Sequence, residues 1–244
     1  MSKRIKFFLT HLSISILISL FILAWVFFVW YPAPLAYAVG VTHIFLMLLA
    51  IDMIVGPLLG LIVYREGKKS LKLDLTFIFI LQISAMGYGI YTIAQGRPAW
   101  IVYNVDRFEL VRNNEIIQKN LSKAEEQYKV VPLFKPQYVA IEQSQDRKQR
   151  SDDMFTEVLG GISLSQMPER YVALEKVKSQ MQRQSQNLEI LYNFNTKSDV
   201  EDILKKYPQA NAWLPLKANA VDMVVLINKE KGEVVKIVDL RPWK

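Results

Sequence analysis

Hydrophobic residues are distributed very unevenly along this chain of 244 residues. Three long apolar runs occupy its first part, at about 7–30, 39–64 and 75–94. Each is long enough to cross a bilayer as a helix, which takes about 20 residues. From about residue 97 onward, charged residues are interspersed as in an ordinary soluble domain. The pattern predicts a three-helix transmembrane domain at 1–96 and a separate folded domain at 97–244.

The charges beside the apolar runs predict the direction of the crossings. The N-terminal segment MSKRIK and the second connecting loop, REGKKSLKLD, are basic, whereas the first loop, YPAPLAYA, has no charge. Because basic loops stay in the cytoplasm, the N-terminus and the second loop are expected there. Three crossings of a bacterial inner membrane then place the domain at 97–244 in the periplasm.

The first apolar run has one alternative interpretation. Ala36-Tyr37-Ala38 resembles a signal-peptide cleavage site. The apolar run before it is longer than the stretch of about 7–15 residues that signal peptides contain, so we expect a retained helix. Cleavage would leave the later domain on the same side, and the mass of the mature protein distinguishes the two cases.

One face of the second apolar run combines a carboxylate with small residues. Asp52, Gly56 and Gly60 follow one another at intervals of four, which places them on the same side of a helix. Gly56 and Gly60 form a GxxxG motif, which lets another helix approach closely, and Pro57 follows directly. Similar faces occur on the other two runs, with Gln82, Ala85 and Gly89 on the third and His11, Ser15 and Ser19 on the first.

The role of this face stays open between three possibilities. A carboxylate facing lipid costs at least a few kcal/mol, so Asp52 should point into the bundle toward Gln82 and a serine of the first run. The face is then a lock that fixes helix register, a docking surface for a client transmembrane helix, or part of a proton or ion relay. The lock is favoured because intramembrane polar groups often serve packing. A relay usually needs several ionisable groups, and Asp52 is the one acid inside the runs.

The rest of the chain mixes strand and helix patterns. Runs rich in β-branched and aromatic residues predict strands at 101–111 and 138–142 and a hairpin over 221–240. Helical periodicity predicts helices at 146–160 and 169–186. Ser198 and Glu201 have the spacing of a capping box for one more short helix. These elements predict an α+β domain with a small, mainly antiparallel sheet.

Composition removes several kinds of chemistry. The chain has no cysteine, which excludes disulfides and thiolate sites, and its two histidines, His11 and His43, both lie in the apolar part. We therefore expect no cofactor and no metal site. Serines and lysines are common, so a Ser–Lys hydrolase stays open on composition alone, but the sequence marks no particular pair, and we assign no catalytic residue. Of the net charge of +7, residues 1–96 contribute +4, mostly beside the apolar runs. That placement indicates membrane topology and argues against nucleic-acid binding.

Charged residues early in the predicted helix at 146–160 are the remaining candidates for a site. Asp152, Asp153 and Glu157 could form an acidic cluster, but acids are common in the first turn of a solvated helix. The run RKQR at 147–150 is interpreted in the same way, as a solvated face.

Four stretches carry a resemblance to a known family. They are IDMIVGPLLGLIVY followed by GKKSLKLDL, then QISAMGYGIYTIAQGRP, IVYNVDRFELV and the C-terminal hairpin ending in DLRPW. With these, the chain resembles the TfpX/TfpZ family of type IV pilin accessory proteins, also called FimB-like. The resemblance covers most of the chain and is least distinctive at about 120–210.

The resemblance implies an inner-membrane protein without enzymatic activity that supports a cognate major pilin and pilus assembly in a chaperone-like role. Expected partners are the membrane helix and periplasmic head of that pilin, the lipid bilayer and, in a homo-oligomer, a second copy of the chain. The pilin helix would meet the face formed by Asp52, Gly56, Pro57, Gly60, Gln82 and Gly89. The pilin head would meet the strand that contains Asp106, Arg107 and Phe108.

Two other functional classes stay in competition with this one. A sensor or signalling subunit would need a partner, because the cytoplasmic segments are too short to form an output domain. A membrane peptidase acting on pilins would need two carboxylates at close range. Asp52 is the one acid inside the apolar runs, and Asp74 lies at the expected cytoplasmic boundary. This arrangement argues against a peptidase.

Overall fold

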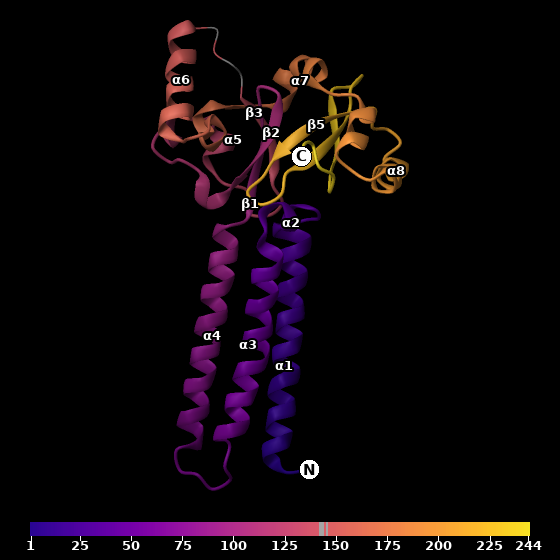
Figure 1. Ribbon diagram of the computed structural model, residues 1–244. Coiled ribbons are helices and arrows are strands. Elements are labelled where there is room, and N and C mark those ends of the chain that lie inside the picture. The colour runs from indigo at the N-terminus through magenta and orange to yellow at the C-terminus, as the bar shows by residue number, and fades with distance from the viewer. Residues whose placement is uncertain (142–143, 145) are drawn as a thin grey trace.

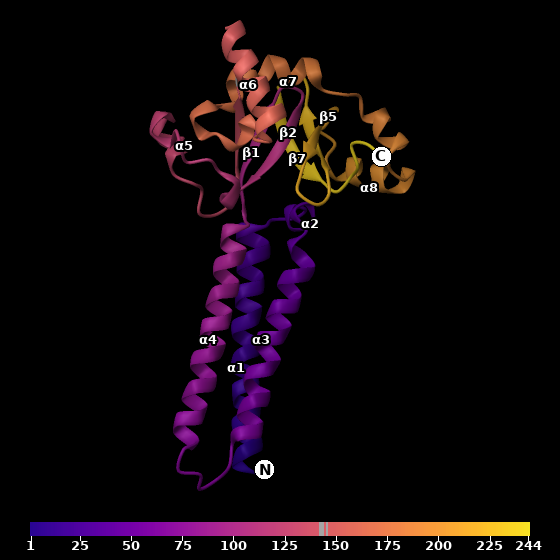
Figure 2. The same ribbon diagram turned by 60° about the vertical axis from the view of Figure 1, so that its left-hand side comes forward.

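A long helical bundle and a globular domain make up this protein (Figure 1, Figure 2). The structure, a computed structural model, describes residues 1–141, 144 and 146–244, and within these it leaves the side chains at 149, 152, 156 and 158 undescribed. The bundle helices are α1 (Lys3–Trp25), prolonged by a π-helical turn at Val26–Trp30, then α3 (Val41–Val63) and α4 (Leu71–Gln95). All three are long and apolar enough to cross a membrane.

The two ends of the bundle differ in what they carry. The N-terminus and the connection between α3 and α4 lie at the end away from the globular domain (Figure 1). This end holds the basic segments, with ion pairs from Lys3 to Glu66 and from Lys68 to Asp74. The other end joins the domain directly, because α4 ends at Gln95 and strand β1 begins at Pro98. The basic segments and the domain are therefore at opposite ends.

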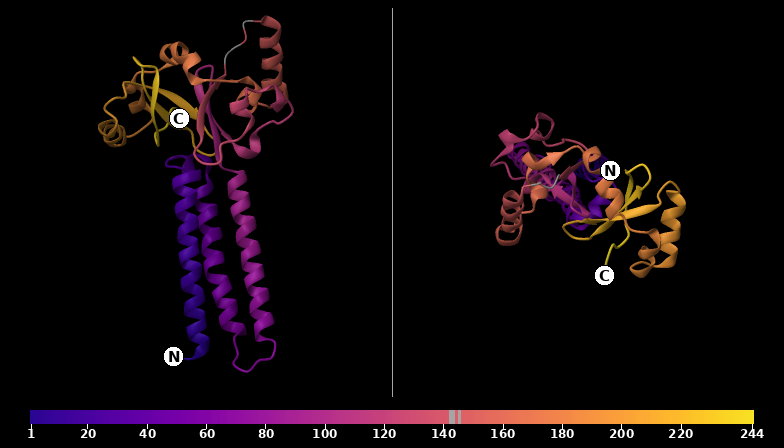
Figure 3. Two further views of the ribbon diagram at one scale, coloured as in Figure 1. Left: turned by 180° about the vertical axis from the view of Figure 1, so that it is seen from behind. Right: turned by 90° about the horizontal axis from the view of Figure 1, so that it is seen from above.

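Helix α3 packs against both α1 and α4 and stands between them when the molecule is seen from behind (Figure 3, left). Their apolar core is concentrated toward the globular end, where Phe45 and Leu49 of α3 contact Ile22, Val26 and Ile93. Helices α1 and α4 approach each other less closely along their backbones and meet through side chains, such as those of His11 and Phe79. The three helices therefore form a bundle and not a flat layer (Figure 2).

A short helix, α2 (Leu35–Val39), fills the connection between α1 and α3. Its residues Leu35 and Ala38 are buried in the core of the globular domain. The carbonyl of Ala38 accepts hydrogen bonds from the main-chain N–H groups of Ala220, at 2.9 Å, and Val221, at 3.1 Å. The uncharged loop of the sequence is therefore a structural joint between bundle and domain.

The globular domain is built on a seven-stranded sheet in the order β4-β3-β1-β2-β5-β6-β7. Pairs β1–β2, β3–β4, β5–β6 and β6–β7 are antiparallel, whereas β1–β3 and β2–β5 are parallel. The predicted α+β class and mainly antiparallel sheet are confirmed. The strands are β1 (Pro98–Asn104), β2 (Arg107–Arg112), β3 (Gln137–Ile141), β4 (Tyr171–Val172), β5 (Ala212–Lys217), β6 (Met223–Asn228) and β7 (Glu233–Val238).

Helices and turns cover both faces of this sheet. Besides α5 (Glu126–Lys129) and α6 (Arg147–Gly160), they include α7 (Lys178–Gln184) and α8 (Lys197–Lys206). Met181 of α7 packs into the central core, and Val200 of α8 packs against Trp213 of β5. The first strand, β1, is buried at every position, because elements cover it on both faces.

Three local predictions were wrong. The single strand predicted at 101–111 is a hairpin, in which β1 and β2 pair antiparallel and the chain turns at Val105 and Asp106. The helix predicted at 169–186 is a strand, β4, followed by 3₁₀ turns and only seven residues of helix α7. The reason is tertiary: Tyr171 pairs with Ile141 of β3, and its ring packs 5.4 Å from that of Trp100. Helix α8 is capped by Thr196, whose hydroxyl accepts from the N–H of Asp199 at 3.3 Å, and not by Ser198.

The predicted strand at 138–142 corresponds to β3, and its last position, 142, lies outside the described residues. Strand β5 was not predicted. Its sequence AWLPLK contains a proline, which usually argues against an inner strand. Pro215 is nevertheless accommodated between β2 and β6.

Candidate functional site

Polar groups from all three bundle helices converge on the side-chain amide of Gln82. Its Nε2 donates to the main-chain carbonyl of Asp52 at 3.0 Å and to Ser15 Oγ at 3.3 Å. Its Oε1 lies 3.0 Å from Nε2 of His11, which therefore carries the proton of this hydrogen bond. One amide thus joins α4 to both α1 and α3. The sequence placed Gln82 near Asp52 and a serine, but it did not indicate His11 as a partner.

The glycines of the predicted face are covered from inside the bundle. A Cβ added to Gly56 would lie 1.9 Å from Oε1 of Gln82, and one added to Gly60 would lie 2.9 Å from the ring of Phe7. A Cβ on Gly89 would lie 2.8 Å from Leu48. Pro57 is buried next to Gly56, and α3 continues through it. These small residues let the three helices approach one another closely.

The carboxyl group of Asp52 is not part of this network. Its Oδ2 atom is buried and has no hydrogen-bond partner among the described residues. Nδ1 of His11 is likewise buried without a hydrogen-bond partner among the described residues. A buried polar atom without a partner is destabilising in apolar surroundings, so a donor supplied from elsewhere would be favourable here.

Two hollows meet at Asp52 and Gln82. One, of about 120 Å³, lies between α1 and α4, and the other, of about 150 Å³, lies between α3 and α4. Ile14 and Ile83 line the first and are themselves 51% and 62% exposed. The α1–α4 hollow therefore communicates with the lateral surface of the bundle. Ser19, which the sequence placed on the polar face of the first run, lines the same hollow.

The strand predicted to contact a partner in the globular domain is mostly an inner element. Phe108 is fully buried, with its ring 5.3 Å from that of Tyr103, and β2 is paired on both sides. Asp106 and Arg107 are accessible at the turn between β1 and β2, where they form an ion pair of 3.0 Å. Of the three residues predicted to contact a partner, Asp106 and Arg107 are therefore accessible and Phe108 is not.

The same turn holds a strained residue that the sequence did not reveal. Val105 has φ 58°, although a side chain branched at Cβ strongly disfavours this region. Its carbonyl accepts hydrogen bonds from the Tyr103 hydroxyl, at 2.9 Å, and from Nε2 of Gln180, at 2.7 Å. Burial of the Tyr103 ring raises the pKa of that hydroxyl, so it remains a donor at alkaline pH. These contacts hold the turn in its conformation.

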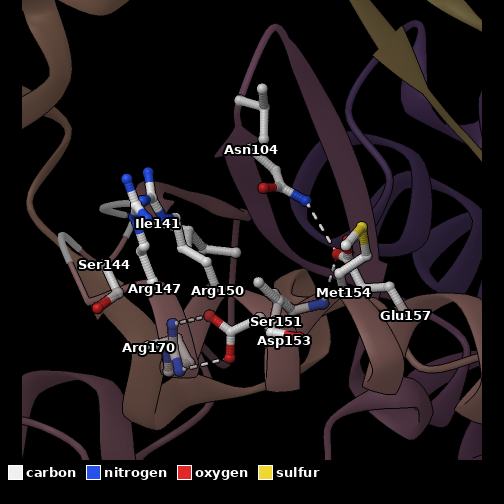
Figure 4. Close-up of a pocket in the computed structure, with 12 residues that line it drawn as sticks. Asn104, Ile141, Ser144, Arg147, Arg150, Ser151, Asp153, Met154, Glu157 and Arg170 are labelled. Carbon is white, nitrogen blue, oxygen red and sulfur yellow. Dashed lines mark hydrogen bonds and ion pairs between the residues drawn. The ribbon is translucent and has the colours of Figure 1, made fainter.

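A hollow of about 510 Å³ lies between α6 and the ends of β1 and β3 (Figure 4). On its wall Arg170 makes two hydrogen bonds to the carboxylate of Asp153, at 3.0 and 2.6 Å. Glu157 accepts from the main-chain N–H of Leu164 at 3.2 Å and, at the limit of 3.5 Å, from Nδ2 of Asn104. Asp153 and Glu157 are thus engaged in structural contacts, and the expectation of a solvated first turn was wrong for them.

Arginines at the rim of this hollow match the sequence interpretation of a solvated face. The side chain of Asp152, the third acid considered with them, lies outside the described residues. Arg147 and Arg150 are exposed at the rim, as the solvated face predicted there requires. Among the described residues, no three histidine or carboxylate side chains gather in a way that could hold a metal ion.

The comparisons with known proteins agree on one family. The family model described as "Fimbrial assembly protein FimB" matches residues 1–40, which cover α1, its π-helical turn and α2. A fimbrial assembly protein of serogroup I from Dichelobacter nodosus is 27% identical over 229 residues, covering 90% of this chain and 88% of the relative. No solved structure matches the chain significantly.

A shorter relative is more similar. The Dichelobacter nodosus fimbrial assembly protein of serogroups C1 and C2 is 31% identical over 116 residues, which are 47% of this chain and 88% of that protein. Identity at this level over nearly the whole length of a relative, together with the longer match above, establishes common ancestry. This chain therefore belongs to the FimB-like family of fimbrial assembly proteins.

Proposed function

We propose that this protein is a non-catalytic accessory protein of the bacterial inner membrane that binds a cognate type IV major pilin and supports its assembly into the pilus. Membership in a family of fimbrial assembly proteins supports the role in assembly. Three helices that can cross a membrane, with basic segments at one end and a globular domain at the other, support a cytoplasmic N-terminus and a periplasmic domain.

One observation carries the proposed pilin-binding site. The Oδ2 atom of Asp52 is buried without a hydrogen-bond partner among the described residues, and Asp52 is one of the residues that line the hollow between α1 and α4. The transmembrane helix of the pilin lies along this hollow and supplies a hydrogen-bond donor to Oδ2. Because Gly56 and Gly60 are covered by Gln82 and Phe7, the pilin helix meets α1 and α4 and not the GxxxG motif itself.

Docking and a purely structural role lead to different expectations for Asp52. A lock requires the Asp52 side chain to hold helices together, yet its carboxyl makes no hydrogen bond to another described residue, whereas the amide of Gln82 makes three. Asp52→Leu should therefore leave the thermal midpoint of the purified protein unchanged or raise it. The same variant should lower the level of pilin and the number of pili in cells.

Photo-crosslinking in cells tests the location. A photoreactive residue at Ile18 or Ile83, which line the hollow, should recover the pilin. Leu20 is the matched control, because it is 56% exposed on α1 and two residues, or about 200° of helix, away from Ile18. Equal pilin yield from Leu20, or only contacts between copies of this chain from Ile18 and Ile83, would contradict the proposed site.

A further inference from the structure

The segment 130–136, with the sequence VVPLFKP, carries exposed apolar side chains on the globular domain. Val130 is 71% exposed, Leu133 67% and Phe134 58%. Single exposed apolar residues are common on soluble proteins, but a consecutive group marks a surface that contacts something apolar. The position of this segment identifies what that is.

Three contacts fix the segment at the end of the bundle. Nε1 of Trp30, the last residue of the first apolar helix, donates to the carbonyl of Leu133 at 3.1 Å. The ring of Phe134 packs 6.3 Å from that of Trp25. On the side of α4, Nη2 of Arg97 donates to the carbonyl of Pro132 at 3.2 Å. The segment is therefore held beside the ends of two helices.

These contacts also give its depth. Trp25 lies five residues before Trp30, which is about 7 Å further into the bundle along a helix. Tryptophan rings favour the boundary between acyl chains and headgroups. Lys135, the next residue, lines a hollow of about 200 Å³ with Lys236 and Pro32, just beyond the first helix. Ammonium groups at that level can reach lipid phosphates while their stems remain in apolar surroundings.

We propose that the segment 130–136 inserts Leu133 and Phe134 into the bilayer, in the leaflet where the three helices meet the globular domain. The domain then touches the membrane on the side of α1 and α4, in addition to being joined to it through α2. The occupant of this apolar surface is lipid, because the segment is continuous with the belt formed by Trp25 and Trp30. The inference rests on the three helices spanning the membrane and is independent of pilin binding.

The absence of native cysteine makes a direct test possible in the full-length protein. Leu133→Cys carries a nitroxide spin label, and the protein is placed in nanodiscs of phosphatidylethanolamine and phosphatidylglycerol. Lipid insertion predicts frequent collision with molecular oxygen and rare collision with a water-soluble nickel chelate. Leu159→Cys is the matched control, since Leu159 is 76% exposed on α6, a helix that projects from the domain away from the bundle (Figure 1), and it should show the opposite ratio.

Each other outcome overturns the proposal. Nickel access at position 133 equal to that at 159 would show a segment in water. Protection from both reagents would show that protein, such as a second copy of the chain, covers it. Val130→Cys provides a second position on the same segment if labelling at 133 alters the fold. An unchanged thermal midpoint identifies the variants that retain the native structure.

Discussion

The side chain of Gln82 in α4 fills the space that a side chain at Gly56 in α3 would need: a Cβ on Gly56 would lie 1.9 Å from the Oε1 atom of Gln82. The missing side chain of the first residue is what allows the amide of the second to reach His11, Ser15 and the Asp52 carbonyl. The register of α4 against both neighbours therefore depends on this glycine.

Gly56→Ala should destabilise the bundle. The methyl group displaces the amide of Gln82, and the hydrogen bonds it makes contribute about 0.6 kcal/mol each inside a membrane bundle, up to about 1.7. We expect a loss of about 1–3 kcal/mol, measured as a lower thermal midpoint in detergent. Gly87→Ala on α4 is the matched control, because no atom lies within 4 Å of a Cβ added there. It should be neutral or slightly stabilising.

A double-mutant cycle tests whether the clash with Gln82 is the cause. In a Gln82→Ala background the space beside Gly56 is empty, so Gly56→Ala should cost much less than in the native chain. If the two substitutions were simply additive, the steric explanation would be wrong. This measurement of stability does not require pilin binding.

Gly40→Ala should loosen the joint between bundle and domain. Gly40 ends α2 with φ 77°, and a Cβ there would lie 2.9 Å from Cβ of Ala220. The substitution therefore combines backbone strain of about 1–2 kcal/mol with a clash against the docked segment. Gly67→Ala isolates the strain, because Gly67 has φ 78° and open space around its Cα. We expect faster limited proteolysis near the joint for Gly40→Ala alone, and equal rates for both variants would argue against docking of α2.

Arg170→Met should destabilise the α6 side of the globular domain. Arg170 and Asp153 are only 18% and 17% exposed, and the substitution leaves the carboxylate of Asp153 without its partner. Charged hydrogen bonds of this kind contribute about 1.5–3 kcal/mol, so the thermal midpoint should fall measurably. The matched control is Lys197→Met, which breaks an exposed pair of 3.7 Å and should cost less than about 0.5 kcal/mol. Similar losses in both variants would contradict a structural role for the Arg170 pair.

Alkaline pH should destabilise the domain through Tyr171. Burial raises the pKa of its hydroxyl, with smaller contributions from the carboxylates of Glu169 and Glu109. The folded protein therefore holds this proton more tightly than the unfolded chain does. The stabilisation is complete below the unfolded pKa of about 10 and is lost as the pH rises above it.

Tyr171→Phe provides the measurement. The hydroxyl donates to the carbonyl of Ser165, so the variant should lose about 1 kcal/mol at neutral pH. Above about pH 10 its stability should decline less steeply than that of the native protein. Denaturation midpoints across this pH range compare the two slopes, and parallel curves would show that Tyr171 does not control the alkaline loss.

Much of the bundle could be predicted from the sequence because its determinants are local. Hydrophobic length identified three helices, and the spacing of Asp52, Gly56 and Gly60 identified the face that turns inward. The spacing of apolar residues was misleading for the segment at 169–186, which has helical periodicity but contains strand β4. Tyr171 is drawn into the sheet by β3 and Trp100, and those partners are distant in sequence.

The exposed segment 130–136 had a sequence signal that periodicity does not detect. Five residues, VVPLF, are apolar in a part of the chain that contains no predicted element. Only the contacts of Leu133 with Trp30 and of Phe134 with Trp25 show that this group lies at the end of the bundle and not in the core.

The sequence by itself therefore determined the class of the protein, the number of membrane helices and the residues of the polar face, since these depend on hydrophobicity and spacing along the chain. Tertiary structure decided how these residues are used. The amide of Gln82 donates to the main-chain carbonyl of Asp52, and Oδ2 of the Asp52 carboxyl has no partner among the described residues. Phe108 is buried in the core of the domain, and residues of α2 are buried there as well. Such outcomes depend on which distant groups meet, and each polar atom bonds to the partner that packing brings within reach.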